Sequence, residues 1–109
     1  MRERRSRTLA FTLAFVASVD VTAADIAAGR RKSATCIPCH GEFGISTQPN
    51  APHLAGQPAP YLGDQLRLFR SGRRPGEVMA VIAKPLTDPD IDDLAAWYEA
   101  IRVEAKPPP

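Results

Sequence analysis

The sequence predicts a small all-α domain. Three stretches, residues 25–35, 60–72 and 87–101, have the composition and spacing of helices, and no stretch has a convincing strand pattern. The segments between them are rich in glycine and proline, which interrupt regular structure. A chain of 109 residues has room for one domain with a modest core, and domains of this size usually need an additional staple.

Residues 1–23 are predicted to be a cleaved signal peptide of the Sec type. Residues 2–7 hold four arginines and one glutamate, an apolar run follows from Leu9 to Val19, and small residues permit cleavage after Ala23 or Ala24. The apolar run is shorter than the roughly 20 residues that a membrane-spanning helix needs. We therefore expect an exported, soluble protein of the periplasm, with no membrane span after the signal is removed.

The segment 24–106 is predicted to be the folded domain, and residues 107–109 are a proline tail. From residue 24 onward the chain holds ten basic and ten acidic residues. Such a balance argues against a nucleic-acid-binding protein, which should carry a basic excess.

The first predicted helix, residues 25–35, leads into the most informative motif of the chain, Cys36-Ile37-Pro38-Cys39-His40. This C-x-x-C-H pattern indicates covalent haem attachment, in which each thiol bonds one vinyl group and the histidine becomes the proximal iron ligand. A thioredoxin-like redox pair, half of a zinc site and a structural disulfide are alternatives for the two cysteines. The sequence lacks the βαβ pattern that a thioredoxin-like pair needs. It also offers barely enough ligands for a zinc site.

Residues 41–60 are predicted to be a long loop, and a loop of this length suggests a purpose such as wrapping a cofactor. Pro60 then opens the second helix in a position that tolerates proline. Leu62, Leu66 and Phe69 share one face of this helix, and Gly72 is a plausible stop. Four arginines between Arg67 and Arg74 gather at its C-terminal end.

Residues 75–81 are predicted to be another loop, and they contain Met79, the only methionine after residue 24. A haem with one histidine ligand needs a second axial ligand, and a downstream thioether is a known solution. We interpret Met79 as the distal ligand, with His53 as its rival and Lys84 as a weaker one.

The last helix is predicted from Thr87, which caps it, with Asp90 three residues on. An apolar stripe follows along the helix, and four aspartates crowd its N-terminal, positive end. The stripe consists of Ile91, Leu94, Ala95, Tyr98 and Ile101, with Trp97 on its flank.

In order and spacing these features resemble the class I cytochromes c, specifically the small monohaem periplasmic carriers and single domains of two-haem relatives. The residues that carry the resemblance are Gly29, Cys36 to Gly41, Pro52 to Gln57, Tyr61-Leu62, Gln65-Leu66, Phe69, Gly72 to Arg74, Met79, Ile82 to Asp88 and Asp93 to Tyr98. The resemblance implies about three main helices around one covalently attached haem c. It implies that Gly29 meets Trp97 and Tyr98 where the first and last helices cross, and that the Pro52 carbonyl accepts a hydrogen bond from the proximal histidine.

The implied function is electron carriage, not enzymatic catalysis: single electrons would pass between periplasmic or membrane-bound redox proteins through a His40/Met79-ligated haem. Two alternatives remain open. The chain could be a haem subunit of a larger dehydrogenase or oxidase, or a haem-based gas sensor or peroxidase-like enzyme with a labile Met79. The basic group Arg67 to Arg74 and the acidic group Asp88 to Asp93 could steer docking, but helix-end electrostatics on solvated faces is the favoured explanation of both.

Overall fold

The computed structural model describes residues 11–15 and 23–109. Its elements are α1 (Ile26–Lys32), a 3₁₀ turn η1 (Ser33–Thr35), α2 (Ile37–His40), α3 (Ala59–Arg70), α4 (Glu77–Ala83) and α5 (Asp88–Ala100). These ranges contain no strand, which agrees with the predicted all-α class. The predicted signal peptide lies largely outside the described residues and stays a prediction.

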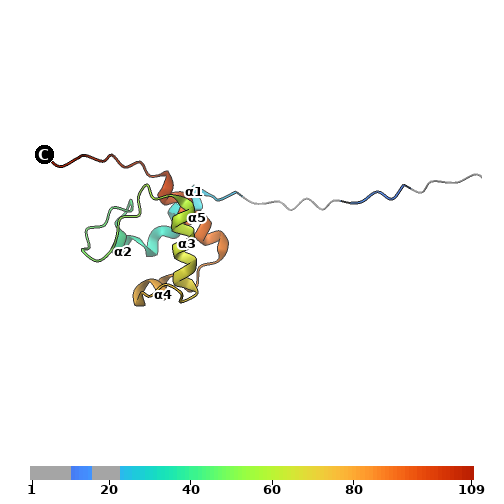
Figure 1. Ribbon diagram of the computed structural model, residues 1–109, viewed down its shortest axis with the longest axis horizontal. Helices are drawn as coiled ribbons and strands as arrows, with labels where there is room; N and C mark the ends of the chain where they lie inside the picture. The colour runs from blue at the N-terminus through green and yellow to red at the C-terminus, as the bar shows by residue number, and fades with distance from the viewer. Residues whose placement is uncertain (1–10, 16–22) are drawn as a thin grey trace, which may run out of the picture.

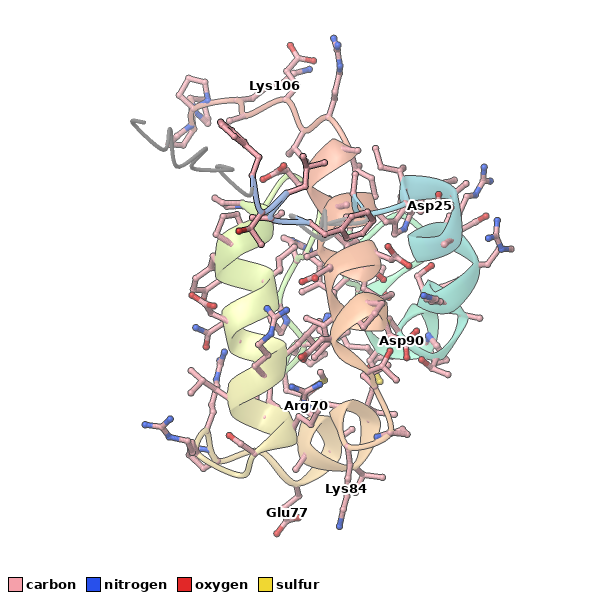
Figure 2. All side chains as sticks on the ribbon, turned by 90° about the vertical axis from the view of Figure 1, so that its right-hand side faces the viewer. Asp25, Arg70, Glu77, Lys84, Asp90 and Lys106 are labelled. Carbon is pink, nitrogen blue, oxygen red and sulfur yellow. The ribbon has the colours of Figure 1, made fainter. Side chains whose placement is uncertain are left out.

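Helix α5 is the central element of the packing. It contacts α1 on one side and α3 on the other, and α3 in turn contacts α4 (Figures 1 and 2). The apolar stripe predicted for α5 is its buried face, because Ile91, Leu94, Ala95 and Tyr98 are each at most 3% exposed. The core therefore lies between α5 and the two helices that flank it.

The predicted cap begins α5. The Asp90 amide donates to the Thr87 hydroxyl, and the Asp90 carboxylate accepts from the Thr87 amide, so both partners of a capping box are present. Pro89 occupies the first turn, where the missing N–H costs nothing.

The crossing of α1 and α5 depends on Gly29. A Cβ built at Gly29 would lie 2.0 Å from the Asp93 carbonyl oxygen and 2.8 Å from the Trp97 Cβ, so only hydrogen fits there. Trp97 thus lies at the crossing as predicted. Tyr98 is rotated by about 100° from Trp97 around α5, and its ring lies beside Gly44 of the loop after α2.

A small polar network ties the same two helices. Asp93 accepts hydrogen bonds from the Asp25 amide and the Lys32 ammonium, each at 2.7 Å, and Lys32 also lies 2.8 Å from Asp90. Figure 2 shows Asp25 at the start of α1, close to α5. The network joins segments that are 68 residues apart in the chain.

The segment from Gly41 to Pro58 is a loop, as predicted, and it is fastened to α5. The Gly56 amide donates to the Tyr98 carbonyl at 2.8 Å, and the Leu54 amide donates to the Gly44 carbonyl at 2.8 Å. These bonds hold the loop as one wall of a cavity. No helix within residues 11–15 and 23–109 is long and apolar enough to cross a membrane.

Candidate functional site

A cavity of about 590 Å³ opens between α2, α3, α4, α5 and the loop after α2. Its walls are mainly apolar and include Leu54, Leu62, Leu66, Phe69 and Leu94. The cavity also collects the residues that the sequence had singled out: Cys36, Cys39, His40, Pro52 and Met79.

The C-x-x-C-H motif forms the short helix α2, which presents its three reactive side chains together. The His40 amide donates to the Cys36 carbonyl at 2.9 Å, closing a single helical turn, and Pro38 sits at its start. Residues three and four apart lie on one face of such a turn. Gly41, with a φ of 82°, ends the turn at a point where a Cβ would meet the Ile45 carbonyl.

The two cysteines lie in different surroundings. Cys36 packs against the core cluster around Tyr98, and burial raises the pKa of its thiol. Cys39 is exposed. No disulfide joins them in this structure, and the described residues contain no cluster of three or more metal-binding side chains that would support a zinc site.

His40 is held in one tautomer by its partner. It is 7% exposed, and its Nδ1–H donates to the Pro52 carbonyl oxygen at 2.8 Å, because a carbonyl can only accept. In the neutral ring Nε2 therefore keeps a free lone pair, which a metal ligand requires. The hydrogen bond is the contact that the family resemblance implied for Pro52.

His53 also lines the cavity, but in the opposite tautomer. Its Nδ1 accepts a hydrogen bond from the Ser46 amide at 2.8 Å, so the proton of the neutral ring is on Nε2. Ligation through Nε2 would need that proton to leave. The arrangement therefore disfavours His53 as an iron ligand.

Met79 lines the cavity from α4, and this corrects the sequence-based expectation of a loop over residues 75–81. Residues Glu77–Ala83 form a helix that starts directly after Gly76. Met79 and Ile82 line the cavity, whereas Val78 and Val81 are 66% and 72% exposed. Lys84, the weaker rival, is exposed at the outer tip of the molecule and does not line the cavity (Figure 2).

Two buried polar atoms lack partners among the described residues, the Tyr98 hydroxyl and the Trp97 indole nitrogen. Tyr98 is 3% exposed, lines the cavity and packs with Cys36. The hydroxyl lies on the protein side of the cavity wall, near the side chains of Cys36 and Ser33. Burial also raises the pKa of Tyr98 well above its usual range.

Comparison with known proteins places this geometry in a family. The family profile "Cytochrome c" matches residues 26–100. The chain is a member of the cytochrome c family. It is therefore an electron-transfer c-type cytochrome and not an enzyme, and its cofactor is covalently attached haem c.

The chain is 42% identical over 81 residues to cytochrome c-554(548) of Halomonas halodenitrificans, with 72% of this chain and 98% of that protein covered. It is also 42% identical over 84 residues to the thiosulfate dehydrogenase electron acceptor of Thiomonas intermedia, with 76% and 39% covered. The structure of reduced recombinant cytochrome c4 from Pseudomonas stutzeri superimposes with a TM-score of 0.67 at 38% identity, with 73% and 47% covered. The chain thus spans less than half the length of the last two.

The residues present fit haem c. Two cysteines, one histidine in the ligating tautomer and one thioether line one mainly apolar cavity. The sequence had not assigned Gln65, Arg74 or Tyr98 to a cofactor site, although all three line the cavity. For Tyr98, the sequence did offer one signal of a buried position, because this residue belongs to the apolar stripe of α5 and follows Trp97.

Proposed function

We propose that this protein is a periplasmic one-electron carrier whose haem is attached through Cys36 and Cys39 and ligated by His40 and Met79. Bound haem c supplies an iron centre that accepts or gives up one electron. The observation that carries the proposal is that these four side chains, which come from α2 and α4, line one cavity.

The chain's own residues set the properties of that centre. The Pro52 carbonyl orients the His40 ring and increases its basicity as a ligand. The Met79 thioether favours the reduced state relative to a second nitrogen ligand and so raises the reduction potential. With both axial positions filled, an external ligand has to displace a protein side chain before it reaches the iron.

Periplasmic location rests on the predicted signal peptide of residues 1–23. The partners we propose are periplasmic or membrane-bound redox proteins that meet the carrier through small, transient contacts. The basic and acidic groups are partly joined, because Arg67 contacts Asp92 at 2.6 Å and Arg70 contacts Asp88 at 2.7 Å. Arg73 is exposed and forms no ion pair among the described residues.

A second candidate is a role as the electron-accepting unit of a larger dehydrogenase. It is favoured by the similarity to the protein named thiosulfate dehydrogenase electron acceptor. Purification from the native membrane and periplasmic fractions separates the two candidates: a free carrier elutes alone, and a subunit elutes in a fixed complex.

The experiment that tests the ligation is an optical spectrum of the exported holoprotein, oxidised and reduced, with and without carbon monoxide. Low-spin spectra that carbon monoxide leaves unchanged are expected, because both axial sites are filled. Prompt binding of carbon monoxide would overturn the proposal and favour a gas sensor or a peroxidase-like enzyme with a labile Met79.

A further inference from the structure

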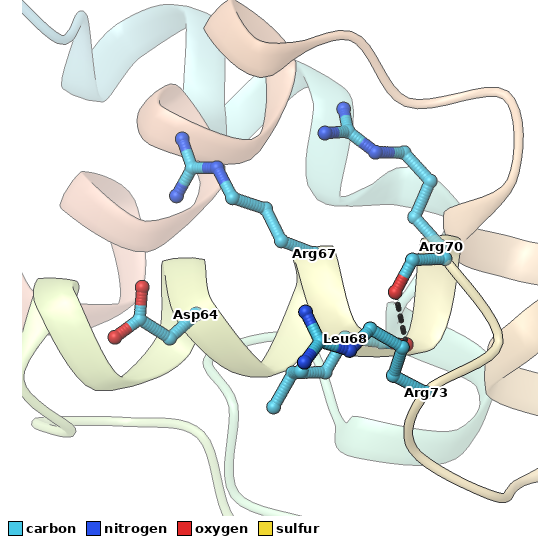
Figure 3. Close-up of a pocket in the computed structure, with 6 residues that line it drawn as sticks. Asp64, Arg67, Leu68, Arg70 and Arg73 are labelled. Carbon is cyan, nitrogen blue, oxygen red and sulfur yellow. Dashed lines mark hydrogen bonds between the residues drawn. The ribbon is translucent and has the colours of Figure 1, made fainter.

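Charge is distributed unevenly over this protein. The outer face of α3 holds a shallow hollow lined by three arginines and an aspartate, which are Arg67, Arg70, Arg73 and Asp64 (Figure 3). By contrast, of the ten basic and ten acidic residues in the segment 24–109, only Glu42 falls within residues 33–63. The surface that α2 and the loop after it contribute is therefore almost uncharged.

Three large apolar side chains are exposed on that surface. Ile37 of α2 is 37% exposed, and Phe43 and Ile45 of the loop are 50% and 48% exposed. The loop stays against α2, because the Ser46 hydroxyl donates to the Cys39 carbonyl at 2.8 Å. We call Ile37, Phe43 and Ile45 the α2 patch.

The loop backbone fixes the exposure of Phe43 and Ile45. Gly44, between them, is buried, and its carbonyl accepts hydrogen bonds from two amides of the same loop at 2.8 and 3.1 Å. A Cβ at Gly44 would lie 2.9 Å from the Tyr98 ring, so the backbone is pressed against the core at this point. The two apolar neighbours of Gly44 are therefore exposed on an anchored segment.

The α2 patch adjoins the place where the proposed function puts the haem. Ile37 lies between the two cysteines, and Cys39 of the same short helix is exposed. A haem attached through Cys39 is therefore close to this surface. A protein that covers the α2 patch lies close to the attached haem.

The size of the patch decides how long a contact can last. Three side chains, each half-exposed or less, offer at most a few hundred Å² of apolar surface. A stable interface buries about 800 Å² on each partner, and transient redox encounters bury less. The α2 patch therefore fits a short-lived contact and not a permanent dimer.

The chemistry of the patch favours an uncharged, apolar partner face. A charged face would lose its hydration there without gaining an ion pair, which is costly. A second copy of this chain presents the same patch, and one surface can meet itself across a two-fold axis. Because the charges of residues 24–109 sum to zero, two copies do not repel each other through net charge.

We propose that the α2 patch docks transiently on the α2 patch of a second copy, and that one electron passes between the two haems in this contact. The proposal rests on the proposed function, because each copy has to carry a redox-active haem. The iron of one copy is oxidised, the iron of the other is reduced, and no bond forms or breaks. Copies of the carrier thereby share electrons directly.

The first test measures electron self-exchange by nuclear magnetic resonance in mixtures of oxidised and reduced holoprotein. Ile45→Lys places a charge in the patch. Val81→Lys is the matched control, because Val81 is 72% exposed on α4 and receives the same charge. We expect Ile45→Lys to slow self-exchange roughly tenfold or more, since like charges then meet in the contact. Equal slowing by the two variants would overturn the proposal.

Opposite charges give a second test. Reduced Ile45→Lys mixed with oxidised Ile45→Glu should exchange electrons faster than either variant does with itself, because the charges then attract across the contact. The pair Val81→Lys and Val81→Glu should show a much smaller gain. Equal gains in the two pairs, or no gain at position 45, would show that the patches do not meet.

A third measurement needs no electron transfer. In fully reduced holoprotein the methyl signals of Ile37 and Ile45 should shift as the protein concentration rises, and those of Val81 should not. Signals of the patch that stay constant would contradict the contact. If all variants keep low-spin spectra that carbon monoxide leaves unchanged, a negative result concerns the patch alone, whereas carbon monoxide binding by the parent would contradict the proposed function.

Discussion

His40 and His53 line the same cavity in opposite tautomers. His40 donates from Nδ1 to the Pro52 carbonyl, and His53 accepts at Nδ1 from the Ser46 amide. Each partner can play only one role, so the tautomer of each neutral ring follows from the backbone around it. The loop after α2 thus prepares one imidazole for iron and makes the other unsuitable.

Replacing His53 tests this difference. We expect His53→Ala to leave the low-spin spectrum and the indifference to carbon monoxide unchanged, because His53 does not supply a ligand. His40→Ala is the contrasting variant, and it should abolish stable holoprotein since attachment and proximal ligation fail together. A sixth site that opens in His53→Ala would show that His53, and not Met79, is the distal ligand.

Replacing Met79 should open the sixth site while the haem stays attached. We expect Met79→Ala to bind carbon monoxide in the reduced state and to have a lower reduction potential, because the thioether no longer favours the ferrous form. Val78→Ala is the matched control, since Val78 is the preceding residue of α4 and is 66% exposed. A Met79→Ala protein with the parent's spectrum and potential would refute the assignment.

The helix crossing makes a stability prediction. Gly29→Ala should destabilise the protein by about 1–3 kcal/mol, the usual cost of overpacking, because its Cβ would overlap the Asp93 carbonyl. Gly63→Ala, in the middle of α3, is the control. There the closest atom to the added Cβ is the tip of the flexible Arg67 side chain, and the gain in helix propensity is up to about 1 kcal/mol. Chemical denaturation of both holoproteins measures the difference, and equal stabilities would contradict this account of the crossing.

The polar network at the same crossing predicts that the folded state loses stability at low pH. The Lys32 ammonium and the Thr87 amide and hydroxyl lower the pKa of Asp90 to about 2, and the Asp25 amide and Lys32 lower that of Asp93. Groups with lowered pKa values stabilise the folded state above their unfolded values and lose this contribution as pH falls through the folded ones. We expect the free energy of unfolding to fall between about pH 4 and pH 2 on account of this network.

Asp93→Asn should reduce that dependence on pH. It should destabilise the protein at pH 7, and the difference from the parent should shrink as the pH approaches 2, because the parent's carboxylate is then also neutralised. Asp92→Asn is the control, since Asp92 is 53% exposed and pairs with Arg67 at the surface. A constant difference across the pH range would show that the charge of Asp93 does not stabilise the crossing.

Local signals in the sequence were enough to predict α3 and α5. These signals depend only on the local backbone, and the structure confirms them. They are Pro60 near the start of α3, Gly72 after its end and the Thr87 cap of α5. The C-x-x-C-H motif is equally local. Covalent haem c was therefore predictable from one short motif and is confirmed by the family.

Features that depend on tertiary packing were not predictable in the same way. Pro75 and Gly76 suggested a loop around Met79, yet Glu77 at the first turn and buried Ala83 at the end make α4 a helix against α3. Tyr98 lines the cavity, whereas Trp97 lies against Gly29, and this division of two adjacent aromatic residues depends on packing. Arg73 and Arg74 have the same side chain, yet only Arg74 lines the cavity. The turn at Gly72 decides which of the two does so, and the sequence does not reveal this.

The contacts between α1 and α5 have a consequence for a shortened chain. The haem-attachment motif at residues 36–40 precedes α5, and α5 supplies the Asp93 and Trp97 partners of Gly29 and the Tyr98 wall of the cavity. A chain truncated before residue 88 keeps Cys36, Cys39 and His40 but lacks this wall. We therefore expect such a chain to be a substrate for haem attachment that does not become a compact cytochrome.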